Sequence, residues 1–106
     1  MISKETINTV VSRLVETYNP VEIYIFGSYA WGHPDEESDL DVAVVIDEYT
    51  QDPHVTLVEG YRALRGLRLS KEILVFSKQE FGSLSEDPAR FCFKIKHDGK
   101  KVYARS

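Results

Sequence analysis

The chain has 106 residues, of which 42% are hydrophobic and 28% are charged, and its net charge is −4. This is the length of one domain and the composition of an ordinary globular protein, so we predict a single domain over residues 1–106. These values exclude a two-domain enzyme with a separate substrate lobe, a fibrous protein and a disordered chain.

The charge is divided unevenly along the chain. Residues 1–53 hold two basic and eleven acidic side chains, a net charge of −9, whereas residues 54–106 hold eleven basic and six acidic ones, a net charge of +5. The acidic first half favours a cation site and does not favour broad binding of nucleic acid. The basic second half leaves a local anion site open.

The first half of the chain predicts a helix, two strands and a turn between the strands. The helix ends before Pro20 and has Ser3 as its N-cap. Residues 21–26 predict a strand, because they are β-branched and aromatic, and a turn or short helix follows it. Residues 39–46 predict the second strand. Helical spacing connects the apolar residues of the helix, which are Ile7, Val10, Val11, Leu14, Val15 and Tyr18.

The second half continues the alternation of helices and strands. Residues 54–68 predict an amphipathic helix, with Arg62, Arg65 and Arg68 on a separate face. Strands are expected over 71–76 and 101–104, and between them a helix begins with Asp87 as N-cap and Pro88 at its first position and stops near Gly99. The order α-β-α-β-α-β-α-β predicts a mixed sheet covered by helices.

The single cysteine, Cys92, cannot form an internal disulfide, and no Cys/His cluster has the spacing of a zinc site. The simplest interpretation is a reducing, cytoplasmic location. No apolar run approaches the roughly 18 residues of a membrane span, and residues 1–5 lack the hydrophobic region of a signal peptide. We therefore expect a soluble, unprocessed protein without a membrane partner.

Two aspartates, Asp39 and Asp41, stand at the head of the predicted second strand. Because one residue separates them, both side chains leave the same face of the sheet. Carboxylates this close repel each other unless a divalent cation lies between them, and oxygen ligands suit Mg²⁺ or Mn²⁺. Solvated charges at a strand edge are the alternative, but the buried strand that follows favours the cation site.

Upstream of the aspartates, Gly27 and Ser28 follow a strand and open a helical turn. Free backbone N–H groups at such a turn can hold a phosphate, Gly27 allows close approach of the backbone, and Ser28 adds a hydroxyl donor. A simple turn is the alternative, and a Walker A loop is excluded because no Gly-Lys-Ser/Thr follows. Together with Asp39 and Asp41, the turn supplies both halves of a metal–triphosphate site.

The motif Gly27-Ser28-x-x-x-Gly32, followed by Ser38-Asp39-x-Asp41, resembles the signature of the DNA polymerase β-like nucleotidyltransferase superfamily. The short chain is similar to the minimal nucleotidyltransferases of this superfamily, the MNT partners of HEPN proteins. The resemblance implies an α+β nucleotidyltransferase fold of two layers, with a mixed sheet flanked by helices. It also implies that Gly27 and Ser28 bind the nucleotide, while Asp39 and Asp41 bind two Mg²⁺ or Mn²⁺ ions.

Members of the family carry a third carboxylate on a neighbouring strand, and Glu72 takes that position here. The family more often has Asp at this position, and it often has Arg where this chain has Trp31. An exposed strand residue is the alternative for Glu72, and a packing residue is the alternative for Trp31. His33, beside the acids, is either a metal ligand, a proton shuttle or an ordinary loop residue.

The resemblance predicts an enzyme in which a hydroxyl attacks the α-phosphorus of a nucleoside triphosphate, with ATP as the favoured donor, and pyrophosphate leaves. Asp39, Asp41 and Glu72 would be the catalytic and metal-binding residues. The acceptor hydroxyl could belong to a HEPN-like partner protein. The alternative function is a catalytically degenerate, antitoxin-like module that neutralises a HEPN-type toxin by contact. The small size favours a protein partner and leaves a homo-oligomer open, whereas a nucleic-acid partner is not favoured.

Overall fold

A computed structural model describes residues 1–105, in which nine helices and strands surround or form one four-stranded sheet. The strand order is β3-β2-β1-β4, with β2 parallel to β3 and β1 antiparallel to both β2 and β4. The four predicted strands are confirmed to within one residue at each end. The elements are α1 (Lys4–Tyr18), β1 (Glu22–Phe26), α2 (Ser28–Trp31), β2 (Leu40–Ile46), α3 (Pro53–Ala63), β3 (Lys71–Ser77), α4 (Lys78–Leu84), α5 (Phe91–Asp98) and β4 (Lys100–Ala104). Within residues 1–105, no helix has the length and apolar character needed to cross a membrane.

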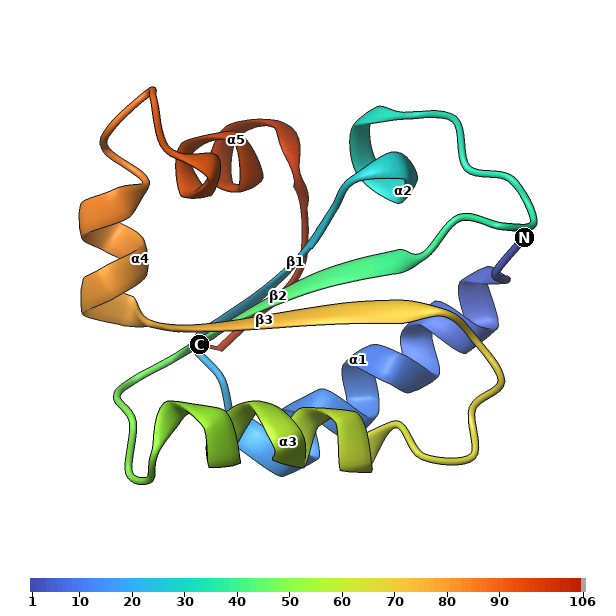
Figure 1. Ribbon diagram of the computed structural model, residues 1–106, viewed down its shortest axis with the longest axis horizontal. Helices are drawn as coiled ribbons and strands as arrows, with labels where there is room; N and C mark the ends of the chain where they lie inside the picture. Colours follow the sequence, from blue (N-terminus) through green and yellow to red (C-terminus); the bar gives the residue numbers. More distant parts are fainter. Residues whose placement is uncertain (106) are drawn as a thin grey trace.

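Helices flank the sheet on both faces. Figure 1 shows α1 and α3 on one side of the sheet and α2, α4 and α5 on the other. Along β2, Val42 and Val44 belong to the core under α1 and α3, whereas Ala43 and Val45 belong to the core under α4 and α5. The expected mixed sheet flanked by helices is confirmed. Its expected two-layer arrangement is corrected to three layers, because β2 buries apolar side chains on both faces.

Local residues explain why α1 keeps its predicted boundaries. The Ser3 hydroxyl accepts a hydrogen bond of 3.1 Å from the N–H of Thr6, which satisfies one of the free amides at the start of the helix. At the other end, Asn19 adopts a left-handed φ of 46°, and its N–H bonds to the carbonyl of Val15. The chain then passes Pro20 and enters β1.

The helix predicted over residues 54–68 is shorter than expected. It ends at Ala63, and the chain leaves it through a turn at Gly66, whose φ of 91° is incompatible with a continuing helix. Arg65 and Arg68 therefore lie in the loop that leads to β3. The prediction that they share a helical face with Arg62 is wrong.

The segment after β3 holds two helices where one was predicted. Helix α4 was missed although Ser77 and Glu80 form a capping box, in which each side chain bonds to the backbone N–H of the other residue. Asp87 does not cap α5, because its carboxylate accepts a hydrogen bond from the Ala89 N–H in the turn before the helix. The predicted stop at Gly99 is confirmed.

Candidate active site

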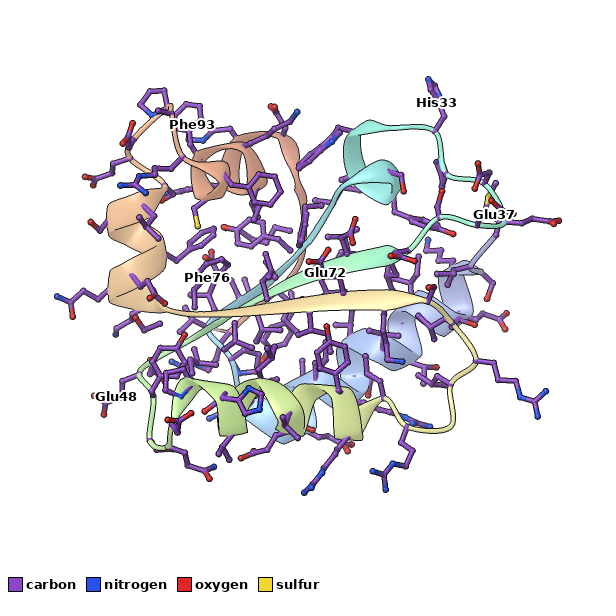
Figure 2. The ribbon with its side chains drawn as sticks, viewed as in Figure 1. His33, Glu37, Glu48, Glu72, Phe76 and Phe93 are labelled. Atoms are coloured by element: carbon purple, nitrogen blue, oxygen red, sulfur yellow. The ribbon has the colours of Figure 1, made fainter. Side chains whose placement is uncertain are left out.

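Asp41 and Glu72 come from neighbouring strands and lie at the same level of the sheet. Asp41 of β2 pairs in parallel register with Glu72 of β3, so one strand spacing of about 4.8 Å separates their backbones. Asp41, Ala43 and Val45 follow one another at every second position of β2, and Ala43 and Val45 face α4 and α5, so Asp41 leaves the sheet on that side. Figure 2 shows Glu72 projecting from β3 toward the same side. The register thus brings two of the three predicted carboxylates together.

The crowding of negative charge changes the acidity of Asp41. Burial, followed by the charges of Glu72 and Asp39, raises the pKa of the Asp41 carboxyl from 3.8 to about 6. Asp41 is half-buried, whereas Glu72 and Asp39 are exposed. Each of these causes penalises the ionised form of Asp41. A bound cation would remove the penalty.

The remaining predicted carboxylate, Asp39, lies beside the pair of Asp41 and Glu72 and just before strand β2. It precedes Leu40, the first residue of β2, and its side chain is exposed. Its charge nevertheless contributes to the raised pKa of Asp41. In the part of the chain that the structure describes, no three acidic, histidine or cysteine side chains are gathered closely enough to hold one ion. The assembled unit is therefore Asp41 with Glu72, and Asp39 flanks it.

Gly27 brings the backbone directly against Asp41. Phe26, the last residue of β1, pairs with Asp41 across the sheet, and Gly27 follows with a φ of 73° and a ψ of −151°. Residues with a side chain rarely adopt these angles. A Cβ atom on Gly27 would also overlap the Oδ2 atom of Asp41. Both observations indicate that this position requires glycine.

Ser28 begins the short helix α2 immediately after this turn, as predicted. The N–H groups of Ala30 and Trp31 donate to the carbonyl of Gly27 at 2.9 and 3.0 Å. The N–H groups of Ser28 and Tyr29 have no acceptor within the helix, because they belong to its first turn. With the Ser28 hydroxyl, they are donors that directly follow Gly27, the residue whose backbone lies against Asp41.

The donor set of the three carboxylates fits a hard divalent cation. Asp39, Asp41 and Glu72 offer only oxygen ligands, which Mg²⁺ and Mn²⁺ prefer. Burial is the largest cause of the raised pKa of Asp41, and the negative charges of Glu72 and Asp39, which raise it further, also attract such an ion. The residues present are therefore chemically suited to the predicted metals.

Three residues near the motif have roles that differ from one another. His33 is exposed, and Figure 2 shows it pointing away from Glu72. The Tyr29 hydroxyl accepts a hydrogen bond of 2.9 Å from the N–H of Ile2, which connects α2 to the start of the chain. Trp31 packs against Phe26, with 6.4 Å between the ring centroids. Trp31 therefore has the packing role that was its alternative interpretation.

Two residues of α5 that the sequence did not single out also lie beside the motif. Phe91 meets the ring of Trp31 edge-on at a centroid distance of 6.3 Å, and the Lys94 ammonium lies 4.6 Å from the centroid of the Trp31 ring. Phe91 and Lys94 are far from Trp31 in the sequence. No local pattern indicates this contact.

Comparisons with known proteins bear on the family and the fold of the chain. The family model described as "Polymerase beta, Nucleotidyltransferase" matches residues 8–106. A crystal structure at 1.40 Å resolution, of a Sulfolobus solfataricus protein provisionally described as a nucleotidyltransferase, matches with a TM-score of 0.62 and 19% identity. That match covers 98% of this chain and 91% of the other, and it concerns the fold. No curated protein matches this chain.

Proposed function

Because this chain belongs to the polymerase β nucleotidyltransferase family, we propose that it transfers a nucleoside monophosphate from a nucleoside triphosphate to a hydroxyl acceptor. ATP is the favoured donor. The acceptor oxygen forms a bond to the α-phosphorus, the bond from that phosphorus to the bridging oxygen of the β-phosphate breaks, and pyrophosphate leaves. The observation that carries the proposal is the close approach of Gly27 to Asp41. It brings the turn whose N–H and hydroxyl groups can bind a phosphate against a carboxylate that can bind a metal ion.

Each predicted residue has a role that follows from its position. The Gly27 turn and the Ser28 hydroxyl bind the triphosphate. Asp39, Asp41 and Glu72 would hold two Mg²⁺ or Mn²⁺ ions, which would offset the charge of the phosphates and favour deprotonation of the acceptor hydroxyl. Asp41 is half-buried and held against Gly27, so it fixes the centre of the site. Glu72 is exposed, so it stands where an acceptor can approach and takes up the hydroxyl proton.

Labelled ATP tests the proposal directly. The protein is incubated with Mg²⁺, co-purified proteins and ATP that carries its label at either the α- or the γ-phosphorus. The α-label should appear on an acceptor, whereas the γ-label should appear only in pyrophosphate. Asp41→Asn and Glu72→Gln should each abolish the transfer, and Glu36→Gln, a change of an exposed acid in the preceding loop, should not. Undiminished transfer in the first two variants would contradict the assignment.

A second candidate function is a binding module that neutralises a HEPN-type partner protein by contact alone. One observation favours it, since within residues 1–105 the three carboxylates are not gathered as a ready-made ion site. The two candidates differ in what happens to the partner. Mass spectrometry of the co-purified partner should show the added mass of a nucleotidyl group if the chain is catalytic, and an unmodified partner in a tight complex if it is not.

A further inference from the structure

An aromatic shelf lies beside the Gly27 turn, and we define it by Phe26, Trp31, Phe91 and Lys94. Phe26 and Phe91 meet edge-on at a centroid distance of 5.4 Å with an interplanar angle of 83°, and Trp31 and Phe91 meet at 88°. The Lys94 ammonium lies over the Trp31 ring. Residues from β1, α2 and α5 therefore form one cluster of three rings and one cation, with the Phe26 ring buried at its base.

Phe91 is the exposed aromatic ring of this shelf. Its side chain is 51% exposed, whereas Phe26 at the base of the shelf is 4% exposed. Lys94 already occupies one position over the Trp31 ring, which is only partly exposed, whereas Phe91 is exposed. An aromatic ring of this size is normally buried, and the core of α5 is formed by other residues, Cys92 and Ile95. Phe91 therefore packs edge-on against Phe26 and Trp31 while about half of its surface stays open to a ligand.

The shelf and the carboxylates share one face of the sheet. Phe26 belongs to the same core as Ala43 and Val45, the face from which Asp41 projects. Phe26 directly precedes Gly27, and Trp31 ends the short helix that Ser28 begins. Figure 1 shows α2 and α5 on this same side. The shelf is thus the immediate neighbour of the proposed triphosphate turn.

We propose that the aromatic shelf binds the base of the nucleoside triphosphate, with the base stacked on Phe91. The inference rests on the proposed function, because that function places the phosphates at Gly27 and Ser28. One ribose separates a base from its phosphates, so a base attached to phosphates at this turn reaches an adjacent surface. The shelf supplies stacking area for the base. Lys94 adds a positive charge, which attracts an anionic nucleotide and offsets part of the negative charge of the nearby carboxylates.

Stacking on the shelf predicts a particular pattern of nucleotide preference. Every base has a π-face, so binding by stacking discriminates weakly between bases of similar size. The polar groups of the shelf, the Lys94 ammonium and the Trp31 indole N–H, offer donors without an acceptor. ATP and GTP should therefore both bind more tightly than CTP and UTP, whose bases offer less stacking area.

Trp31 provides the measurement, because it is the only tryptophan of the chain. ATP with Mg²⁺ should change its fluorescence, and calorimetry should give the affinities of ATP and of inorganic tripolyphosphate, which has no base. Phe91→Leu keeps apolar bulk but removes the ring, and it should weaken ATP binding by about fivefold to a hundredfold. The same variant should leave tripolyphosphate binding unchanged. Phe91→Tyr keeps the ring and should bind ATP like the parent protein.

Phe93→Leu is the matched control on the same helix. Figure 2 shows Phe93 on the side of α5 away from α2, and its ring stacks on His97 with 4.0 Å between centroids. This variant should bind ATP normally. If Phe91→Leu binds ATP as tightly as the parent protein, the base site is refuted while the proposed function stands. If neither ATP nor tripolyphosphate binds in the presence of Mg²⁺, the proposed function and the base site both fail.

Discussion

Replacement of Asp41 by Asn should stabilise the metal-free protein while it removes activity. Burial and the charges of Glu72 and Asp39 raise the pKa of Asp41 from 3.8 to about 6. One pKa unit is worth about 1.4 kcal/mol, so the shift of the Asp41 pKa corresponds to at most about 3 kcal/mol of unfolding free energy. Asp41 is only half-buried, and solvent screening reduces the expected gain to about 1 kcal/mol.

The sign of this effect depends on pH. The folded-state pKa is raised, so the stability that the Asp41 proton contributes is fully present below pH 3.8 and is lost as the pH rises through about 6. Asn carries no such proton. The difference in unfolding free energy between Asp41→Asn and the parent should therefore be close to zero near pH 3.5 and reach its maximum near pH 8.

Urea unfolding in EDTA at pH 3.5, 5, 6.5 and 8 measures this difference. Asp39→Asn is the control, because Asp39 is exposed and its loss should relieve only part of the repulsion on Asp41. The reasoning is refuted if Asp41→Asn is less stable than the parent at pH 8, or if its advantage does not grow with pH. The expected gain of about 1 kcal/mol corresponds to a rise of about 4 to 8 °C in Tm.

Three further predictions test the metal, the turn and the missed helix. Mg²⁺ should raise the Tm of the parent protein at pH 8 and raise it less at pH 4.5, because protons compete for the carboxylates; an equal rise in Asp41→Asn would contradict the proposed ligand. Gly27→Ala should lower the unfolding free energy by about 1 to 3 kcal/mol, because alanine is strained at a φ of 73° and its Cβ would overlap the Asp41 side chain. Gly82→Ala, where an added Cβ meets nothing within 4 Å, should leave the unfolding free energy unchanged or raise it, so a similar loss in both variants would reject the argument from the turn. Ser77→Ala should cost about 1 kcal/mol in denaturant unfolding because it removes the capping box of α4, whereas Ser83→Ala, at an exposed position within that helix, should cost nothing.

The sequence predicted well those parts of the fold that adjacent residues determine. Ser3 and Asn19 bracket α1 by local hydrogen bonds, and the β-branched run before Gly27 ends where the structure turns. The places of Gly27 after the end of β1 and of Asp41 near the start of β2 can likewise be predicted, because each depends on the residues of one strand. Local chemistry of this kind is visible in a single sequence because the interacting residues are close together in the chain.

The remaining parts depend on contacts between distant residues. The pairing of Glu72 with Asp41 requires the register of β3 on β2, which no spacing within either strand specifies. The family resemblance, rather than a local pattern, identified Glu72. The start of α5 was misplaced because Asp87 and the following proline fit a turn as well as an N-cap. The contact of Phe91 with Trp31 follows from the packing of α5 on the sheet.

The position of Glu72 is supported by contacts along the free edge of β3. β3 is an edge strand, so one side of its backbone has no neighbouring strand to pair with. Two tyrosines occupy that side: Tyr61 of α3 accepts a hydrogen bond of 3.0 Å from the N–H of Ile73, and the Tyr49 hydroxyl donates to the carbonyl of Val75 at 2.9 Å. Burial raises the pKa of Tyr49 to about 12, so it remains a donor at neutral pH. Because β2 and these phenols hold β3 on both sides, an exposed glutamate on an edge strand can keep a fixed register opposite Asp41.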